Sequence, residues 1–292
     1  MKAIYDVAAP AKLNLFLHIT GCRPDGYHLL QSVFMLIDWC DTLHFELRTD
    51  GKISRTDIGP ACDTHLPDDD LTVRAAKALQ KACGTSLGAH ISLDKRIPSQ
   101  AGMGGGSSDA ASCLLALQRL WGVQLPRNTL LDIALSLGAD VPFFLSGGNA
   151  WVEGVGEQIT PITLPDANFL VVKPPLGVST PAIFASPVLK RDSEPATLSG
   201  FAALKDQDVF GFGRNDLQPI ASEFCPQISR SLDWLAAQNT VGGLSGRMTG
   251  SGSAVFAHLP ADGKVAVEGF NHPAGWNVRK CKNLQAHPLA GW

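Results

Sequence analysis

The sequence predicts an α+β fold divided into two domains. Its 292 residues exceed the roughly 100–200 residues of a typical single domain, and 45% of them are apolar, enough for more than one core. Strand and helix patterns are mixed along the chain without the regular βαβ repeat of a doubly wound sheet. A Pro174-Pro175 pair follows an apolar strand and is the best local candidate for the passage between domains.

Composition and charge exclude several classes of protein. The net charge is −3, so the chain lacks the basic surplus that binds nucleic acid or an anionic membrane. No apolar run approaches the roughly 18 residues of a membrane span, and the N-terminus lacks a signal-peptide pattern. Seven scattered cysteines without a Cys-x-x-Cys pair argue against a disulfide framework or a zinc site. We expect a cytoplasmic protein with reduced thiols and no structural metal.

Strand patterns dominate the beginning of the chain. Residues 4–47 are expected to form strands, because apolar and polar side chains alternate along Ala11–Ile19 and again along Asp41–Arg48. The segment Arg23-Pro24-Asp25-Gly26 has the composition of a turn and separates two of these stretches. Residues 50–70 are rich in Gly, Pro and Asp, so a loop is expected there.

Helices follow in the middle of the chain. Apolar residues at helical spacing predict a helix over Leu71–Cys83, which Gly84 ends. A strand over Ala89–Lys95 leads to a glycine cluster, and helices are expected over about Ser108–Leu120 and Asn128–Leu137. In the second half we expect strands over Phe169–Lys173, Ala254–Leu259 and Trp276–Lys280, and helices around Pro181–Phe184 and Ile228–Ala237.

The segment from Pro98 to Ala111 is the strongest candidate for a functional motif. Four of its residues between positions 102 and 106 are glycines, which lack the Cβ atom that would keep the backbone away from a ligand. Free N–H groups at the start of the following helix favour an anion, so the segment indicates a phosphate site. It matches neither Walker A nor a G-x-G-x-x-G within a βαβ unit, and a flexible loop is the alternative interpretation.

Lys12 and Asn14 lie on one face of an otherwise apolar strand, about 6.6 Å apart. A lysine in such a strand is costly unless its ammonium group meets an anion or water. The pattern fits a cation directed at a bound anion. It also fits an edge strand whose polar side chains are solvated.

Asp140 follows Gly138, which ends the preceding helix, and precedes Pro142. One interpretation is the N-cap of a short helix that begins near the proline. The other is a carboxylate held at a helix junction as a general base. Spacing alone does not decide between the two.

Three further segments have local interpretations. Thr249-Gly250-Ser251-Gly252 fits a hairpin-like turn or a second backbone nest for phosphate. Thr180-Pro181 fits the N-cap and first residue of a helix. Tyr27-His28 fits the start of a strand.

Together these motifs resemble the GHMP kinase superfamily in order and spacing. Those that carry the resemblance are Pro10–Leu15, Pro98–Ala111, Gly138–Pro142 and Thr249–Gly252. With Gly21–His28, Glu153–Glu157 and Gly177–Pro181, the chain resembles, over nearly its full length, the family of kinases that phosphorylate 4-diphosphocytidyl-2-C-methyl-D-erythritol.

The resemblance implies a two-domain GHMP kinase fold with the site in the cleft between the domains. Residues 1–160 would form a ribosomal-S5-like ATP-binding domain and residues 161–292 a ferredoxin-like α+β domain. The implied reaction transfers the γ-phosphoryl group of ATP to the 2-hydroxyl of the cytidyl substrate, with Mg²⁺ on the phosphates. The implied partner is this small molecule, and the protein would be a monomer or a weak homodimer.

The resemblance also assigns roles to residues. Asp140 would take the hydroxyl proton, and Lys12 would be the cation near that carboxylate and the transferred phosphoryl group. The ATP loop would consist of Pro98, Ser99, Gln100, Ala101, Gly102, Met103, Gly104, Gly105, Gly106, Ser107 and Ser108. The substrate would contact Asn14, Tyr27, His28, Thr180 and Phe184, with Tyr27, His28 and Phe184 holding the cytosine. No metal ligand is assigned.

The chain departs from the family pattern in three places. Ser99-Gln100 replaces a small or apolar pair, Asp70 stands where an asparagine is expected near the adenine, and the tail Lys280–Trp292 is longer than expected. Two alternative functions stay open. One is a GHMP kinase for homoserine, mevalonate or a sugar, and the other is a nucleotide-binding module without catalysis.

Overall fold

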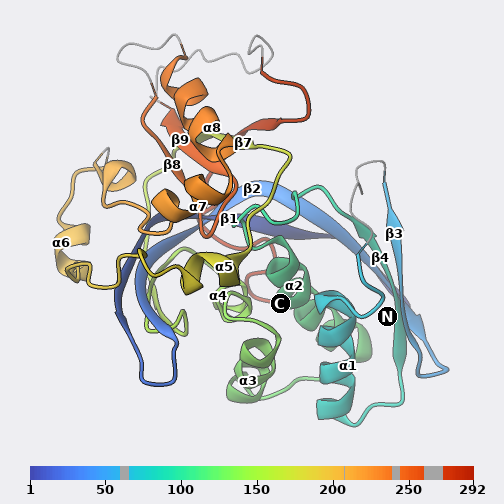
Figure 1. Ribbon diagram of the computed structural model, residues 1–292. Helices are drawn as coiled ribbons and strands as arrows, with labels where there is room; N and C mark the ends of the chain where they lie inside the picture. Colours follow the sequence, from blue (N-terminus) through green and yellow to red (C-terminus); the bar gives the residue numbers. More distant parts are fainter. Residues whose placement is uncertain (60–65, 207, 239–243, 260–271) are drawn as a thin grey trace.

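The computed structural model describes residues 1–59, 66–206, 208–238, 244–259 and 272–292, which form two β-sheets with helices around them (Figure 1). The first half of the chain builds a six-stranded sheet with helices on one side. Its elements are β1 (Ala3–Cys22), β2 (His28–Arg48), β3 (Ile53–Ile58), α1 (Leu71–Cys83), β4 (Gly88–Asp94), α2 (Gly105–Trp121), α3 (Arg127–Leu137), α4 (Val141–Ser146), β5 (Ala150–Glu153) and β6 (Gln158–Pro161).

A long hairpin forms the centre of this sheet. β1 and β2 pair antiparallel, with a register that runs from Ala3 opposite Glu46 to Cys22 opposite His28. The predicted turn joins them, and Gly26 supplies its positive φ of 88°. The strand order is β3-β4-β2-β5-β6 with β1 paired to β2, and the β3–β4 pair is parallel.

The second half of the chain builds a four-stranded antiparallel sheet of order β10-β7-β9-β8. Small helices connect and cover its strands (Figure 1). The elements are β7 (Asn168–Lys173), α5 (Thr180–Ala185), α6 (Leu198–Ala202), a 3₁₀ turn (Val209–Gly211), α7 (Gln218–Phe224), α8 (Gln227–Ala236), β8 (Gly246–Met248), β9 (Val255–Leu259) and β10 (Asn277–Lys282).

The β1–β2 hairpin is buried on both faces. On one face Phe34 belongs to the same buried core as Leu114 of α2, and on the other Leu13 belongs to the same core as Phe169 of β7. The interpretation of Lys12 as a solvated residue of an edge strand is therefore wrong, since only 3% of Lys12 is exposed. The reason is the helix side of the sheet, where the Phe34 ring, Gly104 before α2 and Asp140 before α4 enclose the Lys12 side chain.

The sequence prediction misses several short elements. β3 lies inside the expected loop 50–70, of which residues 60–65 are outside the described ranges. Its side chains include Arg55 and Asp57, and the strand is held by backbone pairing with β4 rather than by an apolar pattern. The β5–β6 hairpin lies in a segment interrupted by glycines, and α6, α7 and β8 are likewise too short for a periodic signal.

The glycine cluster itself opens α2. The helix begins at Gly105, three residues before the predicted start at Ser108, because Gly104 adopts the left-handed conformation at the N-cap. Glycine has a low helix propensity, so a prediction from the sequence places the start of α2 after the glycines and therefore too late.

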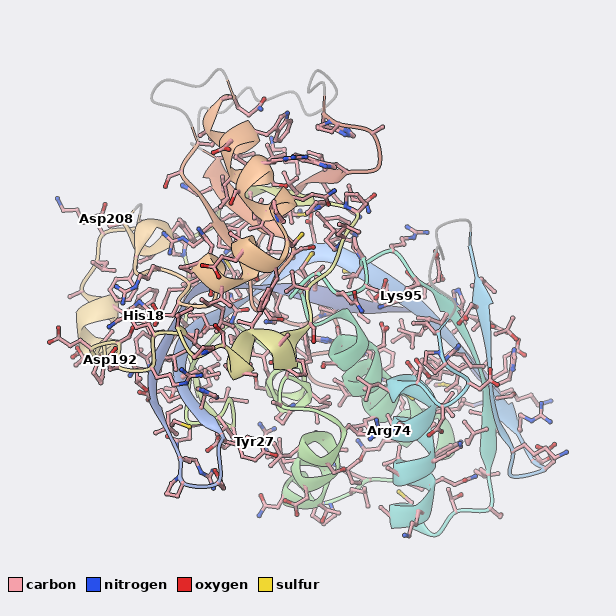
Figure 2. The ribbon with its side chains drawn as sticks, in the orientation of Figure 1. His18, Tyr27, Arg74, Lys95, Asp192 and Asp208 are labelled. Atoms are coloured by element: carbon pink, nitrogen blue, oxygen red, sulfur yellow. The ribbon has the colours of Figure 1, made fainter. Side chains whose placement is uncertain are left out.

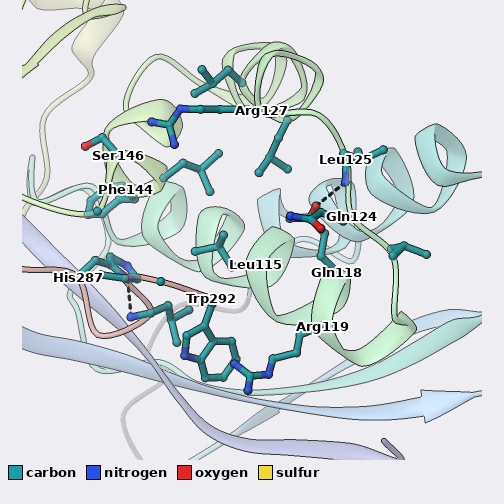
Figure 3. Close-up of a pocket in the computed structure, with 18 of the residues that line it drawn as sticks. Leu115, Gln118, Arg119, Gln124, Leu125, Arg127, Phe144, Ser146, His287 and Trp292 are labelled. Atoms are coloured by element: carbon teal, nitrogen blue, oxygen red, sulfur yellow. Dashed lines mark hydrogen bonds between the residues drawn. The ribbon is translucent and has the colours of Figure 1, made fainter.

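The C-terminal tail returns from the second sheet to the first. Asn283 forms a bridge with Ile37, and Leu289 is buried in the core beside α2 and α4. The Trp292 ring lies 4.7 Å from the Arg119 guanidinium. Figure 3 shows the cavity of about 820 Å³ that the tail closes at the C-terminal end of α4, and none of the predicted site residues lines it.

The sequence predicts no membrane-spanning segment and reduced cysteine thiols, and the described residues bear on both predictions. Within them, no helix has both the length and the apolar character needed to cross a bilayer. Six cysteines have free thiols, and Cys62 lies outside the described residues; the six are Cys22, Cys40, Cys83, Cys113, Cys225 and Cys281.

A buried ionic cluster lies under the glycine cluster. The Lys95 ammonium group, directly after β4, donates to Asp41 of β2 and, over 2.8 Å, to Asp109 of α2. Asp41 also accepts the backbone N–H group of Ile97 over 2.7 Å. Burial opposes the charge on Lys95, but the carboxylates of Asp109 and Asp41 raise its pKa overall. The cluster ties the start of α2 to the sheet.

We expect Lys95→Met to destabilise the protein by about 3–5 kcal/mol, because it leaves two buried carboxylates without their cation. Lys77→Met is the matched control, since Lys77 pairs with Asp69 at 2.7 Å but both side chains are more than half exposed. The control should cost less than about 1 kcal/mol. Urea denaturation measures both, and equal losses would contradict a structural role for the cluster.

Candidate active site

A cavity of about 560 Å³ opens between the two halves of the molecule, and predicted site residues from five separate segments line it. A smaller cavity of about 320 Å³ shares the glycine cluster with it and is lined by residues 98–107. The structure thus brings together the predicted Lys12, Asn14, Tyr27, His28, Gly102, Gly104, Ser107, Asp140, Thr180 and Phe184.

Lys12 enters the cavity from β1 and is surrounded by polar and aromatic partners. Its Nζ lies 2.5 Å from Asn14 Oδ1, 3.5 Å from Asp140 Oδ2 and 4.7 Å from the centre of the Phe34 ring. A buried ammonium group is costly unless a charge or dipole balances it, and these contacts provide that balance. The result is a fixed cation beside a carboxylate in the cavity wall.

Asp140 occupies the N-cap position of α4, but its side chain makes no capping hydrogen bond. The helix-cap interpretation of its carboxylate is therefore wrong. The Asp140 side chain is 32% exposed, whereas that of Lys12 is 4% exposed, so the carboxylate is the partner that a ligand can reach. This geometry suits a group that accepts a proton from a bound hydroxyl.

The glycine cluster lines the cavity with backbone atoms, because Gly102 and Gly104 have no side chain. Gly104 has φ 70°, and a Cβ atom there would lie 3.0 Å from Phe144 and 3.3 Å from Lys12. No side chain caps α2, whose N–H groups at the first turn are therefore left for a ligand. With the dipole of this 17-residue helix, they form a site for an anion such as phosphate.

A turn between β8 and β9 holds the glycine cluster from the other side. A Cβ atom at Gly102 would lie 2.2 Å from the Thr249 carbonyl oxygen, and one at Gly250 would lie 2.6 Å from the Gly102 carbonyl oxygen. The Ala254 N–H group donates to the Ala101 carbonyl over 3.2 Å. The second glycine signal is thus a turn that packs against the first and reaches the cavity through Gly250.

Aromatic rings from both halves of the chain lie at the other end of the cavity. Tyr27, just before β2, is 64% exposed (Figure 2). The His28 and Phe184 rings lie 4.9 Å apart at an angle of 38°. Burial lowers the pKa of His28, and so does the nearby charge of Arg191. The imidazole is therefore neutral at pH 7.

Two predicted residues have unexpected local roles. Ser179, not Thr180, caps α5, because its hydroxyl accepts the Ala182 N–H group over 3.5 Å. The Thr180 hydroxyl instead lies 2.6 Å from the Ser251 hydroxyl, across the cavity wall. Ser108 is fully buried and lines neither cavity, and its N–H group donates to the Gly104 carbonyl.

Sequence reasoning misses the residues that hold these groups in place. Ser32 accepts a hydrogen bond of 2.9 Å from the Asn14 side chain, and Thr249 accepts one of 2.9 Å from the Asn14 backbone. Asn215 donates to the Met248 and Gly250 carbonyls, both over 2.8 Å. Asn14 and Ser32 are 18 positions apart on paired strands, and the other contacts join residues more than thirty positions apart, so no local pattern predicts them.

The fold is that of the GHMP kinases. Residues 70–148 match the model of that family, described as the GHMP kinases N terminal domain. A crystal structure of homoserine kinase from Cytophaga hutchinsonii has the same fold, with a TM-score of 0.70 at 19% identity over 98% of this chain and 96% of that one.

Relatives of higher sequence identity show which family of GHMP kinases the chain belongs to. A 4-diphosphocytidyl-2-C-methyl-D-erythritol kinase of Polaromonas sp. (strain JS666) is 71% identical over 100% of this chain and 95% of its own length. The 4-diphosphocytidyl-2-C-methyl-D-erythritol kinase of Polaromonas naphthalenivorans is 70% identical over 100% of this chain and 97% of its own length. A crystal structure of 4-(cytidine 5'-diphospho)-2C-methyl-D-erythritol kinase has a TM-score of 0.75 at 32% identity, covering 94% of this chain and 98% of that one. The chain belongs to the 4-diphosphocytidyl-2-C-methyl-D-erythritol kinase family.

We expect Gly102→Ala to destabilise the protein by roughly 1–3 kcal/mol, because its Cβ atom meets backbone at 2.2 Å and its φ is positive. Gly106→Ala adds the same methyl group to the same segment, but its nearest neighbour is a Leu71 methyl carbon at 3.5 Å. Thermal unfolding should separate the two variants clearly. Equal stability would show that the turn between β8 and β9 does not hold the glycine cluster.

Proposed function

We propose that this chain transfers the γ-phosphoryl group of ATP to the 2-hydroxyl of 4-diphosphocytidyl-2-C-methyl-D-erythritol, giving the 2-phosphate and ADP. This reaction is a step of the non-mevalonate isoprenoid pathway. The observation that carries the proposal is the Lys12–Asp140 pair, 3.5 Å apart, in a cavity shared by the glycine cluster and the His28 and Phe184 rings. The names of relatives 58–71% identical to this chain support the choice of substrate.

The glycine cluster binds the phosphates of ATP in this proposal. Residues from Pro98 to Ser107 line the smaller cavity, and the N-terminus of α2 faces the same space. Backbone N–H groups and the helix dipole stabilise the negative charge of the phosphate oxygens. Ser108 contributes through the helix start rather than through its buried hydroxyl.

Asp140 acts as the general base and Lys12 as the electrostatic partner. The Asp140 carboxylate takes the proton of the 2-hydroxyl as the substrate oxygen bonds to the γ-phosphorus and the bond to the ADP oxygen breaks. The Lys12 ammonium group lies where it stabilises negative charge on the carboxylate and on the transferred group. Phosphoryl transfer depends mainly on such positioning and charge stabilisation.

Mg²⁺ fits this site as an ion held chiefly by the nucleotide. Among the described residues, no group of three or more histidine, cysteine or acidic side chains is arranged to hold a metal. Ser107 lines both cavities, and its hydroxyl would join the phosphate oxygens as a ligand. When bound, the ion neutralises phosphate charge.

The proposal extends to domains and location. The division into domains 1–160 and 161–292 is supported by the two sheets, since the last strand of the first sheet, β6, ends at Pro161 and the second sheet begins with β7 at Asn168, although the tail returns to the first sheet. A cytoplasmic location is supported by the free thiols of the six described cysteines.

The test is ADP release by the purified protein with ATP and one acceptor at a time. We expect release with 4-diphosphocytidyl-2-C-methyl-D-erythritol and none above background with homoserine or mevalonate. Release with one of the other acceptors instead would assign the chain to a different GHMP activity. ATP binding without release for any acceptor would favour a nucleotide-binding module.

Asp140→Asn should lower kcat by about 10²–10⁴, because the amide keeps the shape of the side chain but cannot accept the proton. The loss of stability should stay below about 1 kcal/mol, since the partly exposed carboxylate makes no capping bond and Lys12 keeps its hydrogen bond to Asn14. Asp132→Asn, an exposed residue of α3, is the control and should retain full kcat. Activity of Asp140→Asn within a few-fold of wild type would remove Asp140 as the base.

Tyr27→Ala should raise KM for the cytidyl substrate and for its uridyl analogue by similar factors. Stacking of a base on an aromatic ring contributes roughly 1–3 kcal/mol and tolerates either base. The exposed Tyr27 ring has no structural role that the substitution would disturb. Steady-state kinetics with both substrates measures the effect, and a loss confined to one base would contradict stacking.

A further inference from the structure

A second cavity lies apart from the cleft, between α2, α3, α4 and the C-terminal tail (Figure 3). Its volume of about 820 Å³ is within the range of roughly 300–1,000 Å³ that is typical of sites for small molecules. Phe144 separates it from the glycine cluster, because Phe144 lines this cavity while a Cβ atom at Gly104 would lie 3.0 Å from the same ring. The two sites are therefore distinct but share one side chain as a wall.

Much of the wall of this second cavity is apolar. Leucine side chains reach it from α2, from the loop after α2, from α3, from α4 and from the tail. They are Leu115, Leu125, Leu130, Leu131, Leu145 and Leu289. All of them except Leu289 are only partly buried. Such a wall favours an apolar group in the cavity, because the contact removes apolar surface from water.

The charged side chains of the wall are cationic. Arg119 and Arg127 line the cavity, and none of the described residues that line it is acidic. Neither guanidinium group forms an ion pair with a described carboxylate. A cavity lined by charge of one sign attracts a ligand of the opposite sign, so this wall favours an anion.

The two arginines lie on opposite sides of the cavity and differ in their surroundings (Figure 3). Arg119 belongs to the last turn of α2, the negative end of the helix dipole, and its guanidinium lies 4.7 Å from the Trp292 ring. Arg127 is the first residue of α3, an 11-residue helix whose N-cap, Pro126, makes no side-chain capping bond. The free N–H groups and the positive dipole end of α3 add to the charge of Arg127. An acidic group is therefore bound best at Arg127.

His287 adds an unpaired donor to the same wall. It is 2% exposed, and its Nδ1 accepts the Leu289 N–H group over 3.1 Å (Figure 3). Burial lowers the pKa of His287 to about 4, so the ring is neutral at pH 7 and its proton is on Nε2. In the described part of the chain Nε2 has no hydrogen-bond partner. A buried donor without a partner is costly, so this wall favours a ligand that carries acceptors.

We propose that this cavity binds a small anionic amphiphile, whose acidic head group pairs with Arg127 and whose apolar chain lies against the leucines. A carboxylate and a phosphate both fit the fork of a guanidinium group, so the shared chemistry is an acidic head on an apolar chain. The inference does not rest on the proposed function, because no residue lines both this cavity and the cleft.

The first test uses the wild-type protein and four probes with the same eight-carbon chain. They are octanoate, octyl phosphate, octanol and octyltrimethylammonium, each titrated by calorimetry below its micelle concentration. We expect saturable binding of at least one of the two anions, at least about tenfold tighter than that of octanol, and no measurable binding of the cation. Equal affinity for octanol and the anions, or no binding of either anion, would overturn the proposal.

The second test asks whether Arg127 holds the head group. Arg127→Met should weaken binding of the tighter anion by about tenfold or more and leave the Kd of octanol unchanged. Arg74→Met is the matched control, since Arg74 is an exposed arginine of α1 outside this cavity, and it should leave both Kd values unchanged. Thermal unfolding confirms that each variant is folded. Equal affinity of wild type and a folded Arg127→Met protein, or equal losses in the two variants, would contradict the proposal.

The third test places the probe. Titration of the tighter anion is repeated in the presence of a saturating non-hydrolysable ATP analogue, and we expect binding of one probe per chain to persist. Leu131→Gln, which makes a partly exposed position of the wall polar, should weaken the anion and octanol by similar factors. An ATP analogue that excludes the probe would place it in the cleft, and unchanged affinity in Leu131→Gln would place the chain elsewhere. Either result overturns the proposal, and none of these measurements needs turnover.

Discussion

The backbone contact between the glycine cluster and the turn from β8 to β9 is the constraint on which the rest of the site depends. Neither Gly102 nor Gly250 leaves room for a Cβ atom, so only glycine allows the two segments to approach. The same turn accepts the Asn14 N–H group through Thr249 and thereby fixes the strand that carries Lys12. A contact between two sheets thus places a phosphate site, a cation and a carboxylate around one cavity.

Two buried lysines show how charge serves structure in one place and chemistry in another. Lys95 lies between the carboxylates of Asp41 and Asp109, both fully enclosed, and this cluster fixes the start of α2. Lys12 has a single carboxylate partner, Asp140, and that partner is partly exposed to the cavity. The desolvation cost of a buried ammonium group is offset in both cases. Only the Lys12 pair can be reached by a ligand, because Asp140 is partly exposed whereas Asp41 and Asp109 are buried.

Much of this arrangement could be predicted from the sequence, and the exceptions have physical causes. The long hairpin, α1, α3, α8 and the strands β7, β9 and β10 follow from periodicity and from turn residues such as Gly26. The edge strand β3 and the short helices lack a periodic signal, because backbone pairing and tertiary packing hold them. The burial of Lys12 needs the packing of α2 and α4 on the sheet, and the absence of a capping bond from Asp140 needs the geometry of α4. Ser32 and Asn215 act through partners distant in sequence, which no local pattern contains.

The most direct test of the account is a crystal structure of the protein with a non-hydrolysable ATP analogue and 4-diphosphocytidyl-2-C-methyl-D-erythritol. The account predicts the terminal phosphate between the glycine cluster and Lys12, and the substrate 2-hydroxyl oxygen within about 2.6–3.2 Å of the Asp140 carboxylate. It also predicts the cytosine beside His28 and Phe184. A complex in which the 2-hydroxyl contacts a different group, with Asp140 turned away to cap α4, would contradict it.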